Sequence, residues 1–234
     1  MNLVLVFRED FADESRVVLR GRRAGHVREV HRAAVGDTIV VGLAGGRTGH
    51  GRVVRIGEEI EMEITLDRDP PPPLEVTLVL ALPRPKVLNR VVAAVTSLGV
   101  KRIFLINAWR VEKSYWKSPR MAEKNLHDQA VIGLEQARDT MLPSIETRRL
   151  FRPFVEDELP SIVAGTTALV AHPYASGECP RDVRGPITLA IGPEGGFIQE
   201  EIESLTRIGF RAVTIGPRIL RVETAISTLI GRLS

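Results

Sequence analysis

One stretch divides the chain and also begins its second half. From Asp69 to Ile106 the sequence reads DPPPPLEVTLVLALPRPKVLNRVVAAVTSLGVKRIFLI. Four consecutive prolines cannot continue a helix or donate to a sheet, so residues 70–73 predict a stiff linker. The apolar runs 74–82 and 100–106 are typical of buried strands, and residues 85–98 between them repeat apolar side chains at helical spacing. A strand, a helix and a second strand in this order indicate a parallel sheet covered by helices.

The same alternation continues to the end of the chain. Short buried strands are predicted at 167–171, 187–191 and 212–215, and helices at 122–138, 200–208 and 224–233. Residues 74–234 are therefore expected to form an α/β domain. The last predicted helix carries an apolar stripe formed by Ile226, Leu229, Ile230 and Leu233. A helix of the core and a helix at a dimer interface would show the same stripe.

The segments before the linker are short and typical of strands. Strands are predicted at 2–7, 38–43, 51–56 and 60–66, and a short helix at 26–32. Residues 42–51 are rich in glycine, but they lack the Gly-Lys-Ser/Thr of a phosphate-binding loop and precede no predicted helix, so a hairpin turn is favoured. Residues 1–69 are therefore expected to form a small β-barrel.

The composition excludes several classes of protein. The chain has 234 residues, of which 44% are hydrophobic and 26% charged, and these ordinary values exclude wholesale disorder. No run of about 18 apolar residues occurs, and the start lacks the basic segment of a signal peptide, so a cytoplasmic protein without a membrane partner is expected. The single cysteine, Cys179, excludes an intrachain disulfide. The histidines show no paired spacing, so no metal is expected.

Positive charge is concentrated in two parts of the chain. Residues 16–55 carry nine arginines against two acids, and residues 84–124 carry ten lysines and arginines against two acids. Residues 56–69 lie between them and are acidic. Two basic segments favour a polyanionic partner such as a nucleic acid, because neutralised phosphates supply most non-specific affinity. A solvated basic face without a partner would show the same pattern.

Three loops that follow predicted strands carry the residues expected of a ligand site. These loops are residues 171–173, 191–197 and 215–224. Ligands of open α/β sheets bind beyond the carboxyl ends of the strands, where such loops meet. Two of the loops contain Gly-Pro, in which the glycine allows close backbone approach and the proline stiffens the loop. A tight turn would explain one such loop, whereas two after successive strands favour a ligand site.

A short aromatic segment is interleaved with basic residues. Its members are Trp109, Tyr115 and Trp116 among Arg110, Lys113 and Lys117. Such a segment is typical of a surface on which nucleic-acid bases stack. It is equally typical of packing at a subunit interface, and the sequence leaves both interpretations open.

The paired Gly-Pro loops resemble the signature of a known family. Residues 192–196, Gly-Pro-Glu-Gly-Gly, and residues 216–224, Gly-Pro-Arg-Ile-Leu-Arg-Val-Glu-Thr, are similar to the two motifs of the bacterial 16S ribosomal RNA uridine-N3 methyltransferases. That family belongs to the SPOUT class of methyltransferases. The resemblance covers the whole chain, since residues 26–37, 98–100 and 135–136 resemble further motifs of the family.

The resemblance implies a fold and a reaction. Residues 1–69 would form a PUA-like RNA-binding β-barrel, residues 70–73 a linker, and residues 74–234 a SPOUT α/β domain with a deep trefoil knot. The cofactor would be S-adenosyl-L-methionine, and the substrate would be a uridine in the decoding region of 16S rRNA, methylated at N3 on the 30S subunit. The protein would be a homodimer. Ribose 2′-O methylation and non-catalytic RNA binding on the same fold are the alternatives.

The resemblance also implies site residues. The cofactor would be bound by Ala171, His172, Ile191, Gly192, Pro193, Glu194, Gly195, Gly196, Ile215, Gly216, Ile219 and Leu220. Arg221 would stabilise the charge that develops on the uracil. Glu223 would accept the N3 proton; the alternative is that it is only an acid at the N-terminus of a helix, where the helix dipole favours negative charge. Phosphate contacts in the N-terminal domain are predicted for Arg8, Arg22, Arg23, Arg28 and Arg32.

The sequence departs from the family pattern at several positions. These positions are Ala94, Ser97, Trp109, Asp139, Ile198 and Val222. Trp109 stands where the family usually has an acid before an arginine, and Ile198 stands where a Ser or Thr usually caps a helix. We expect these departures to affect the RNA-facing surface more than the cofactor loops.

Overall fold

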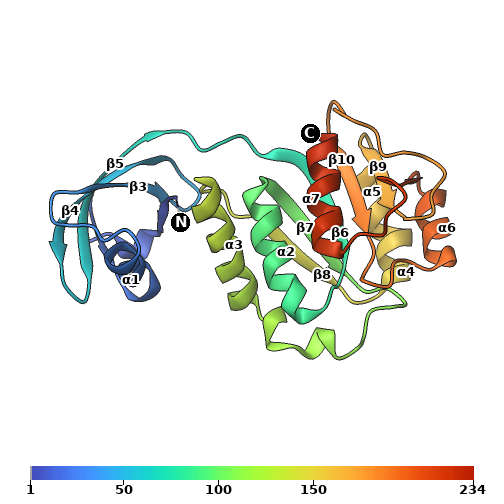
Figure 1. The fold of residues 1–234 in the computed structure, drawn as a ribbon, viewed down its shortest axis with the longest axis horizontal. Helices are drawn as coiled ribbons and strands as arrows, with labels where there is room; N and C mark the ends of the chain where they lie inside the picture. The colour runs from blue at the N-terminus through green and yellow to red at the C-terminus, as the bar shows by residue number, and fades with distance from the viewer. Residues whose placement is uncertain (1) are drawn as a thin grey trace. The chain divides into compact units, whose positions relative to one another are not determined.

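The structure, a computed structural model, describes residues 2–234 and divides into two compact units (Figure 1). The first unit contains the residues up to Pro72 together with Val131–Leu142, and the second contains Pro73–Ala130 and Pro143–Ser234. Val131–Leu142 thus packs within the first unit, although it lies in the middle of the catalytic domain predicted from the sequence. The assignment of residues 1–69 and 74–234 to two functional domains stays a prediction.

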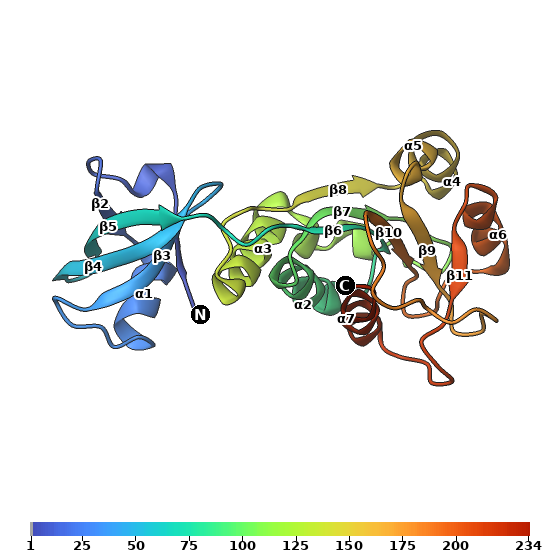
Figure 2. The same ribbon diagram turned by 90° about the horizontal axis from the view of Figure 1, so that it is seen from above.

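The first unit is built on a five-stranded mixed sheet. Its elements are β1 (Val4–Val6), β2 (Arg16–Leu19), α1 (Gly21–Glu29), β3 (Thr38–Leu43), β4 (Thr48–Ile56) and β5 (Ile60–Arg68). The strand order is β1-β3-β4-β5-β2, in which β1 pairs in parallel with β3 and the other pairs are antiparallel. The curled sheet encloses an apolar core that includes Val17, Val41 and Met62 (Figure 2).

Two parts of the first unit differ from the sequence prediction. Helix α1 begins earlier than predicted and ends at Glu29, and Arg32 beyond it has a φ of 51°, a left-handed conformation that an α-helix does not contain. The hairpin predicted at residues 42–51 is confirmed, since β3 and β4 pair antiparallel, but its turn is shorter than predicted because Gly42, Gly49 and Gly51 belong to the strands. A Cβ atom at Gly49 would lie 1.9 Å from the carbonyl oxygen of Thr65, so the close pairing of β4 with β5 requires glycine there.

The second unit is a six-stranded parallel sheet with helices on both faces (Figure 2). Its strands are β6 (Leu74–Ala81), β7 (Val100–Ile106), β8 (Ser144–Arg148), β9 (Thr167–Ala171), β10 (Ile187–Ile191) and β11 (Arg211–Val213). Its helices are α2 (Pro85–Ser97), α4 (Phe151–Pro153), α5 (Leu159–Val163), α6 (Gln199–Arg207) and α7 (Val222–Leu233). The strand order is β11-β9-β10-β6-β7-β8, and the boundary between the two units falls within α3 (Glu123–Ala137). The predicted fold class, a β domain followed by an α/β domain, is confirmed.

Helices α2 and α7 lie side by side on one face of the parallel sheet (Figure 1). Pro85 is the first residue of α2. A backbone N–H has no partner within the helix at that position, so proline, which lacks one, costs the helix no hydrogen bond. The apolar stripe of α7 is buried in the same core, with exposures of at most 1%, at Ile226, Leu229, Ile230 and Leu233. The stripe belongs to the core, so it gives no support to a dimer interface on this helix.

Sequence patterns do not reveal strand β8 or the helical segment 151–163. The edge strand β8 reads Ser-Ile-Glu-Thr-Arg and carries little of the apolar character that marks the central strands. The helical segment contains Pro153 and Pro160, which conceal its pattern, yet it buries Phe154 and Leu159. Of the helices in residues 2–234, none is long and apolar enough to cross a membrane.

Candidate functional site

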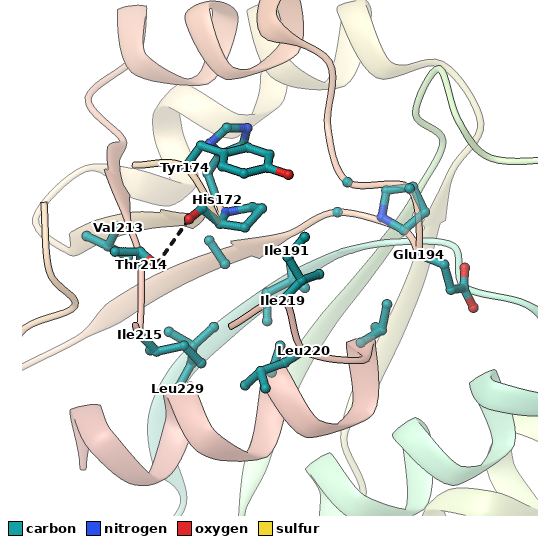
Figure 3. A pocket seen from close by; sticks show the side chains of 18 of the residues that line it. His172, Tyr174, Ile191, Glu194, Val213, Thr214, Ile215, Ile219, Leu220 and Leu229 are labelled. Atoms are coloured by element: carbon teal, nitrogen blue, oxygen red, sulfur yellow. Dashed lines mark hydrogen bonds between the residues drawn. The ribbon is translucent and has the colours of Figure 1, made fainter. Parts of the chain in front are cut away.

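A pocket of about 410 Å³ lies at the carboxyl edge of the parallel sheet, where strands β9, β10 and β11 end (Figure 3). Its walls come from the three loops that follow these strands and from the first turns of α7. The lining residues are those of 171–174, 191–196, 213–215 and 218–220, with Arg110, Val222, Ala225 and Leu229. The loops meet because β9 lies between β10 and β11, so the three carboxyl ends are neighbours in space.

The loop after β10 requires glycine for its shape. A Cβ atom at Gly192 would lie 2.7 Å from the backbone nitrogen of Phe197, so only glycine lets the loop fold back onto itself. Gly196 has a φ of 73°, and its N–H donates to the carbonyl oxygen of Pro193 at 2.7 Å. The three glycines of this loop line the pocket with backbone alone, beside the side chains of Pro193 and Glu194.

Two charged residues hold this loop in place. The Glu194 carboxylate accepts a hydrogen bond from the backbone N–H of Arg84 at 3.0 Å, which ties the loop to the start of α2. The Arg110 guanidinium donates to the carbonyl oxygen of Gly195, and its stem packs against the same glycine. Glu194 therefore orders its own loop, whatever else it binds.

His172 and Tyr174 form the aromatic side of the pocket (Figure 3). Their rings meet edge to face with centroids 5.8 Å apart. Burial, and to a lesser extent the positive charge of Arg110, lowers the pKa of His172 below its ordinary value. The imidazole is therefore neutral at physiological pH and adds no positive charge to the site.

The loop after β11 places apolar side chains at the mouth of the pocket. Ile219 is 69% exposed and Leu220 is 36% exposed, and both line the pocket. The Thr214 hydroxyl donates to the carbonyl oxygen of Gly216 at 3.0 Å, and Gly216 has a φ of 136°. These two side chains therefore leave apolar surface uncovered at the mouth of the pocket.

The residues predicted to bind the cofactor lie together in the structure. All twelve except Gly216 line the pocket, while Gly216 shapes the loop behind it. Their role in binding stays a prediction. Sequence reasoning did not single out Arg110 or Tyr174 as pocket residues, and it missed the inner face of α7. The position of Arg110, shortly after the end of β7, is a signal that could have found it.

The two predicted catalytic residues lie at the start of α7. Arg221 is the exposed N-cap residue of this helix, and Glu223 follows in its first turn. A Glu223 oxygen lies 3.1 Å from an Arg90 nitrogen of α2. Neither Glu223 nor Glu194 forms an ion pair with Arg221 among the described residues, so no such bridge fixes the third loop.

The predicted RNA-binding arginines fall into two groups. Arg23 is largely buried and binds the Asp10 carboxylate with both arms of its guanidinium, and Arg22 lies 3.0 Å from Glu135. Arg28 donates to the carbonyl oxygen of Gly57 at 2.8 Å. Arg23 thus helps to hold the fold of the first unit, whereas Arg22 and Arg28 make their contacts at the surface and stay exposed. Arg8 and Arg32, which are also exposed, make up the other group.

Acids of strand β5 and the turn before it neutralise part of the first basic segment. A Glu63 carboxylate oxygen lies 2.6 Å from a guanidinium nitrogen of Arg52, and a Glu59 oxygen lies 2.6 Å from one of Arg20. The sequence separates these acids from the arginines, but the antiparallel sheet brings them together. The basic surface of the first unit is therefore smaller than the arginine count suggests.

A parallel α/β sheet with a glycine-walled pocket at its carboxyl edge defines a ligand-binding α/β domain of the kind that serves enzymes. Residues 70–234 match the model of the RNA methyltransferase domain family, and the chain belongs to this family. The family resemblance seen in the sequence is thereby confirmed.

Relatives match along nearly the whole chain. Ribosomal RNA small subunit methyltransferase E of Treponema pallidum is 29% identical over 235 residues, covering 96% of this chain and 87% of that protein. The protein of the same name from Mycobacterium tuberculosis is 27% identical, covering 92% of this chain and 84% of its own length.

Solved structures share the fold of both units. The ribosomal RNA small subunit methyltransferase E of Neisseria gonorrhoeae, bound to S-adenosyl methionine, has a TM-score of 0.75 at 23% identity and covers 97% of this chain and 95% of its own. A putative methyltransferase of Legionella pneumophila, also in complex with this cofactor, has a TM-score of 0.76 at 23% identity, covering 98% of this chain and 96% of its own.

Proposed function

We propose that this protein transfers a methyl group from S-adenosyl-L-methionine to N3 of a uridine in 16S ribosomal RNA. The observation that carries the proposal is the pocket, which two Gly-Pro loops enclose in a member of the RNA methyltransferase family. The names of the relatives and the cofactor in the two similar structures support it.

The residues of the pocket fit this cofactor. Ile191, Ile215 and Leu229 offer an apolar surface to a flat adenine ring, and the glycine-walled loop offers backbone N–H and C=O groups to its polar parts. A bound ligand would also cover the exposed side chains of Ile219 and Leu220. The cofactor supplies an electrophilic methyl group on a sulfonium sulfur.

Two residues at the start of α7 are proposed to act on the uracil. N3 of uridine carries a proton at neutral pH, so negative charge develops on the ring as the proton leaves. Arg221 would stabilise this charge by donating from its planar guanidinium to a uracil oxygen. Glu223 is the candidate for accepting the proton, and it must first leave Arg90. Its ion pair and its place in the first turn of α7 favour the alternative, a structural acid at a helix N-terminus.

The proposed partners follow from this reaction. Residues 1–69 would hold RNA by its phosphates, residues 70–73 would act as a linker, and residues 74–234 would carry the reaction. The substrate would be a uridine of the decoding region on the assembled 30S subunit. The protein would work in the cytoplasm as a homodimer, and the chain of its catalytic domain would form a trefoil knot. Methyl transfer from a sulfonium needs no metal, and residues 2–234 contain no cluster of three potential metal ligands.

Transfer of a labelled methyl group tests this function. Purified protein is incubated with labelled S-adenosylmethionine and either 30S subunits or naked 16S rRNA, and the modified nucleoside is then identified. N3-methyluridine on 30S subunits is the expected product. A ribose 2′-O-methylated nucleoside would show that the protein catalyses that alternative reaction. Cofactor binding without methyl transfer would favour a non-catalytic RNA-binding protein.

A further inference from the structure

Trp109 presents a large apolar ring to solvent beside the pocket. Its side chain is 78% exposed. Its backbone is fixed, because its N–H donates to a carboxylate oxygen of the buried Glu201 at 2.8 Å. The other oxygen of Glu201 accepts the N–H of Ile198 at 3.0 Å, so one carboxylate holds both the Trp109 loop and the start of α6. An exposed ring on an anchored backbone is typical of a binding surface.

The two other aromatic residues of this segment serve the fold. The Trp116 indole N–H donates to the Asn107 side-chain oxygen at 2.9 Å, and the Arg149 guanidinium lies 5.6 Å from the centre of its ring. Tyr115 donates to Glu112 at 3.0 Å. Both rings pack against the core of the second unit. Packing within the second unit thus accounts for Trp116 and Tyr115, and the two interpretations that the sequence leaves open, base stacking and a subunit interface, concern Trp109 alone.

The chain places Trp109 at the edge of the pocket. The next residue, Arg110, lines the pocket and donates to the carbonyl oxygen of Gly195. Consecutive Cα atoms are about 3.8 Å apart, so the Trp109 backbone adjoins the pocket wall, while its exposed indole faces solvent and does not line the pocket. Arg110 and the exposed Arg218 both line the pocket and add positive charge to its wall. An exposed indole beside arginines matches a single-stranded nucleic acid, which offers flat bases and negative phosphates together.

We propose that the Trp109 indole stacks on an unpaired base of the RNA next to the nucleotide that is methylated, while nearby arginines contact the adjoining phosphates. This inference rests on the proposed function and adds a positioning residue to it. Trp109 holds the RNA strand and takes no part in the chemistry. Stacking accepts any base, so Trp109 contributes affinity and placement rather than sequence choice.

Binding to 30S subunits tests the proposal with three variants. Trp109→Ala should weaken equilibrium binding about 5- to 150-fold, the usual range for loss of one base–aromatic stack. Trp109→Phe should recover much of this loss, because its ring still stacks. Trp116→Phe is the matched control: it lowers thermal stability through the lost hydrogen bond to Asn107 but should leave 30S affinity near wild type. In steady-state methyl transfer, Trp109→Ala should raise KM for the subunits more than it lowers kcat.

The outcomes separate this inference from the proposed function. Calorimetric affinity for S-adenosylmethionine should be equal in the wild type and in Trp109→Ala, and methyl transfer by the wild type tests the function itself. If the wild type transfers no methyl group, the function fails and the 30S affinities still decide the role of Trp109. Unchanged 30S binding by Trp109→Ala would overturn the proposal. A fall in molecular mass by light scattering in that variant would instead place the indole between two copies of the chain.

Discussion

At the scale of single residues, the role of Arg221 turns on what its guanidinium contacts. The acids that could tie it to the loop are engaged elsewhere: Glu223 pairs with Arg90, and Glu194 accepts the backbone N–H of Arg84. A loop-holding salt bridge is thus disfavoured by the structure. An exposed arginine at the start of α7, directly after Leu220 of the pocket wall, is placed to meet a substrate.

Arg221→Ala should therefore lose turnover rather than cofactor affinity. Removal of one electrostatic donor at a reacting oxygen typically lowers kcat about 10²–10³-fold, and we expect cofactor affinity to change by less than about tenfold. Arg221→Lys should recover only part of the rate, since an ammonium lacks the planar fork. Single-turnover rates at saturating cofactor, measured beside a cofactor titration, check this. Loss of affinity and thermal stability together, with a normal single-turnover rate, would assign Arg221 to the loop.

Gly192 offers a second test at this scale. In Gly192→Ala the new Cβ would lie 2.7 Å from the Phe197 nitrogen and 2.9 Å from the Gly196 carbonyl carbon, so the loop backbone must shift. We expect cofactor affinity to fall at least about tenfold, which corresponds to about 1.4 kcal/mol. Gly231→Ala is the control, because a Cβ there meets no atom within 4 Å and alanine favours α7 by up to about 1 kcal/mol. Calorimetry measures the cofactor affinity of both variants. Equal affinities would contradict the view that Gly192 shapes the loop that binds the cofactor.

At the scale of elements, the C-terminal part of α3 and the turn after it complete the first unit. Val131 and Leu134 pack with Leu3 and Leu5 in a small apolar cluster. Glu135 is fully buried there, accepts the N–H of Leu5 at 3.4 Å and pairs with Arg22. Burial raises the pKa of the Glu135 carboxyl, and Arg22 opposes this only in part.

The raised pKa gives Glu135 a defined effect on stability. The native carboxyl holds its proton at pH values where the unfolded chain has lost it, so this group's contribution to the free energy of unfolding falls as pH rises from 4.5 through the folded-state pKa. Glu135→Gln removes the titration. The free energies of unfolding of the wild type and of Glu135→Gln, measured with urea at several pH values, should therefore differ in a pH-dependent way. The variant should gain stability relative to the wild type as pH rises through this window. A constant or opposite difference would mean that Arg22 dominates the site.

At the scale of the whole molecule, the sequence predicted the parts whose signal is local. Strand Ile187–Ile191 is buried along its whole length, and Val100–Ile106 is buried from Ile103 onward, and the predicted bounds of both strands matched the structure. The Gly-Pro loops were found because glycine and proline mark tight turns directly. The packing of Val131–Leu142 with β1 could not be predicted, because it joins segments about 130 residues apart through tertiary contacts. For the same reason the partners of Arg23 and Arg52 were invisible in the sequence.

These ion pairs change which arginines should contact RNA. The side chains of Arg8, Arg20, Arg32 and Arg52 are all exposed. A guanidinium nitrogen of Arg20 lies 2.6 Å from a Glu59 carboxylate oxygen, and one of Arg52 lies 2.6 Å from a Glu63 oxygen, whereas Arg8 and Arg32 form no ion pair among the described residues. A guanidinium that already faces a carboxylate releases fewer counterions when a phosphate approaches. The double variant Arg8→Gln/Arg32→Gln should therefore weaken 30S binding and reduce the slope of log affinity against log salt by about 2, or about one for each phosphate contact.

The paired arginines supply the control for this prediction. Arg20→Gln/Arg52→Gln removes the same formal charge from the same unit, yet it should change the salt slope much less. Filter binding to 30S subunits over a range of salt concentrations measures both slopes, and cofactor affinity should stay at the wild-type value in both variants. Equal slopes for the two double variants would mean that net charge, rather than the exposed arginines, governs the approach of the RNA. A loss of cofactor affinity with RNA binding intact would overturn the assignment of RNA binding to residues 1–69.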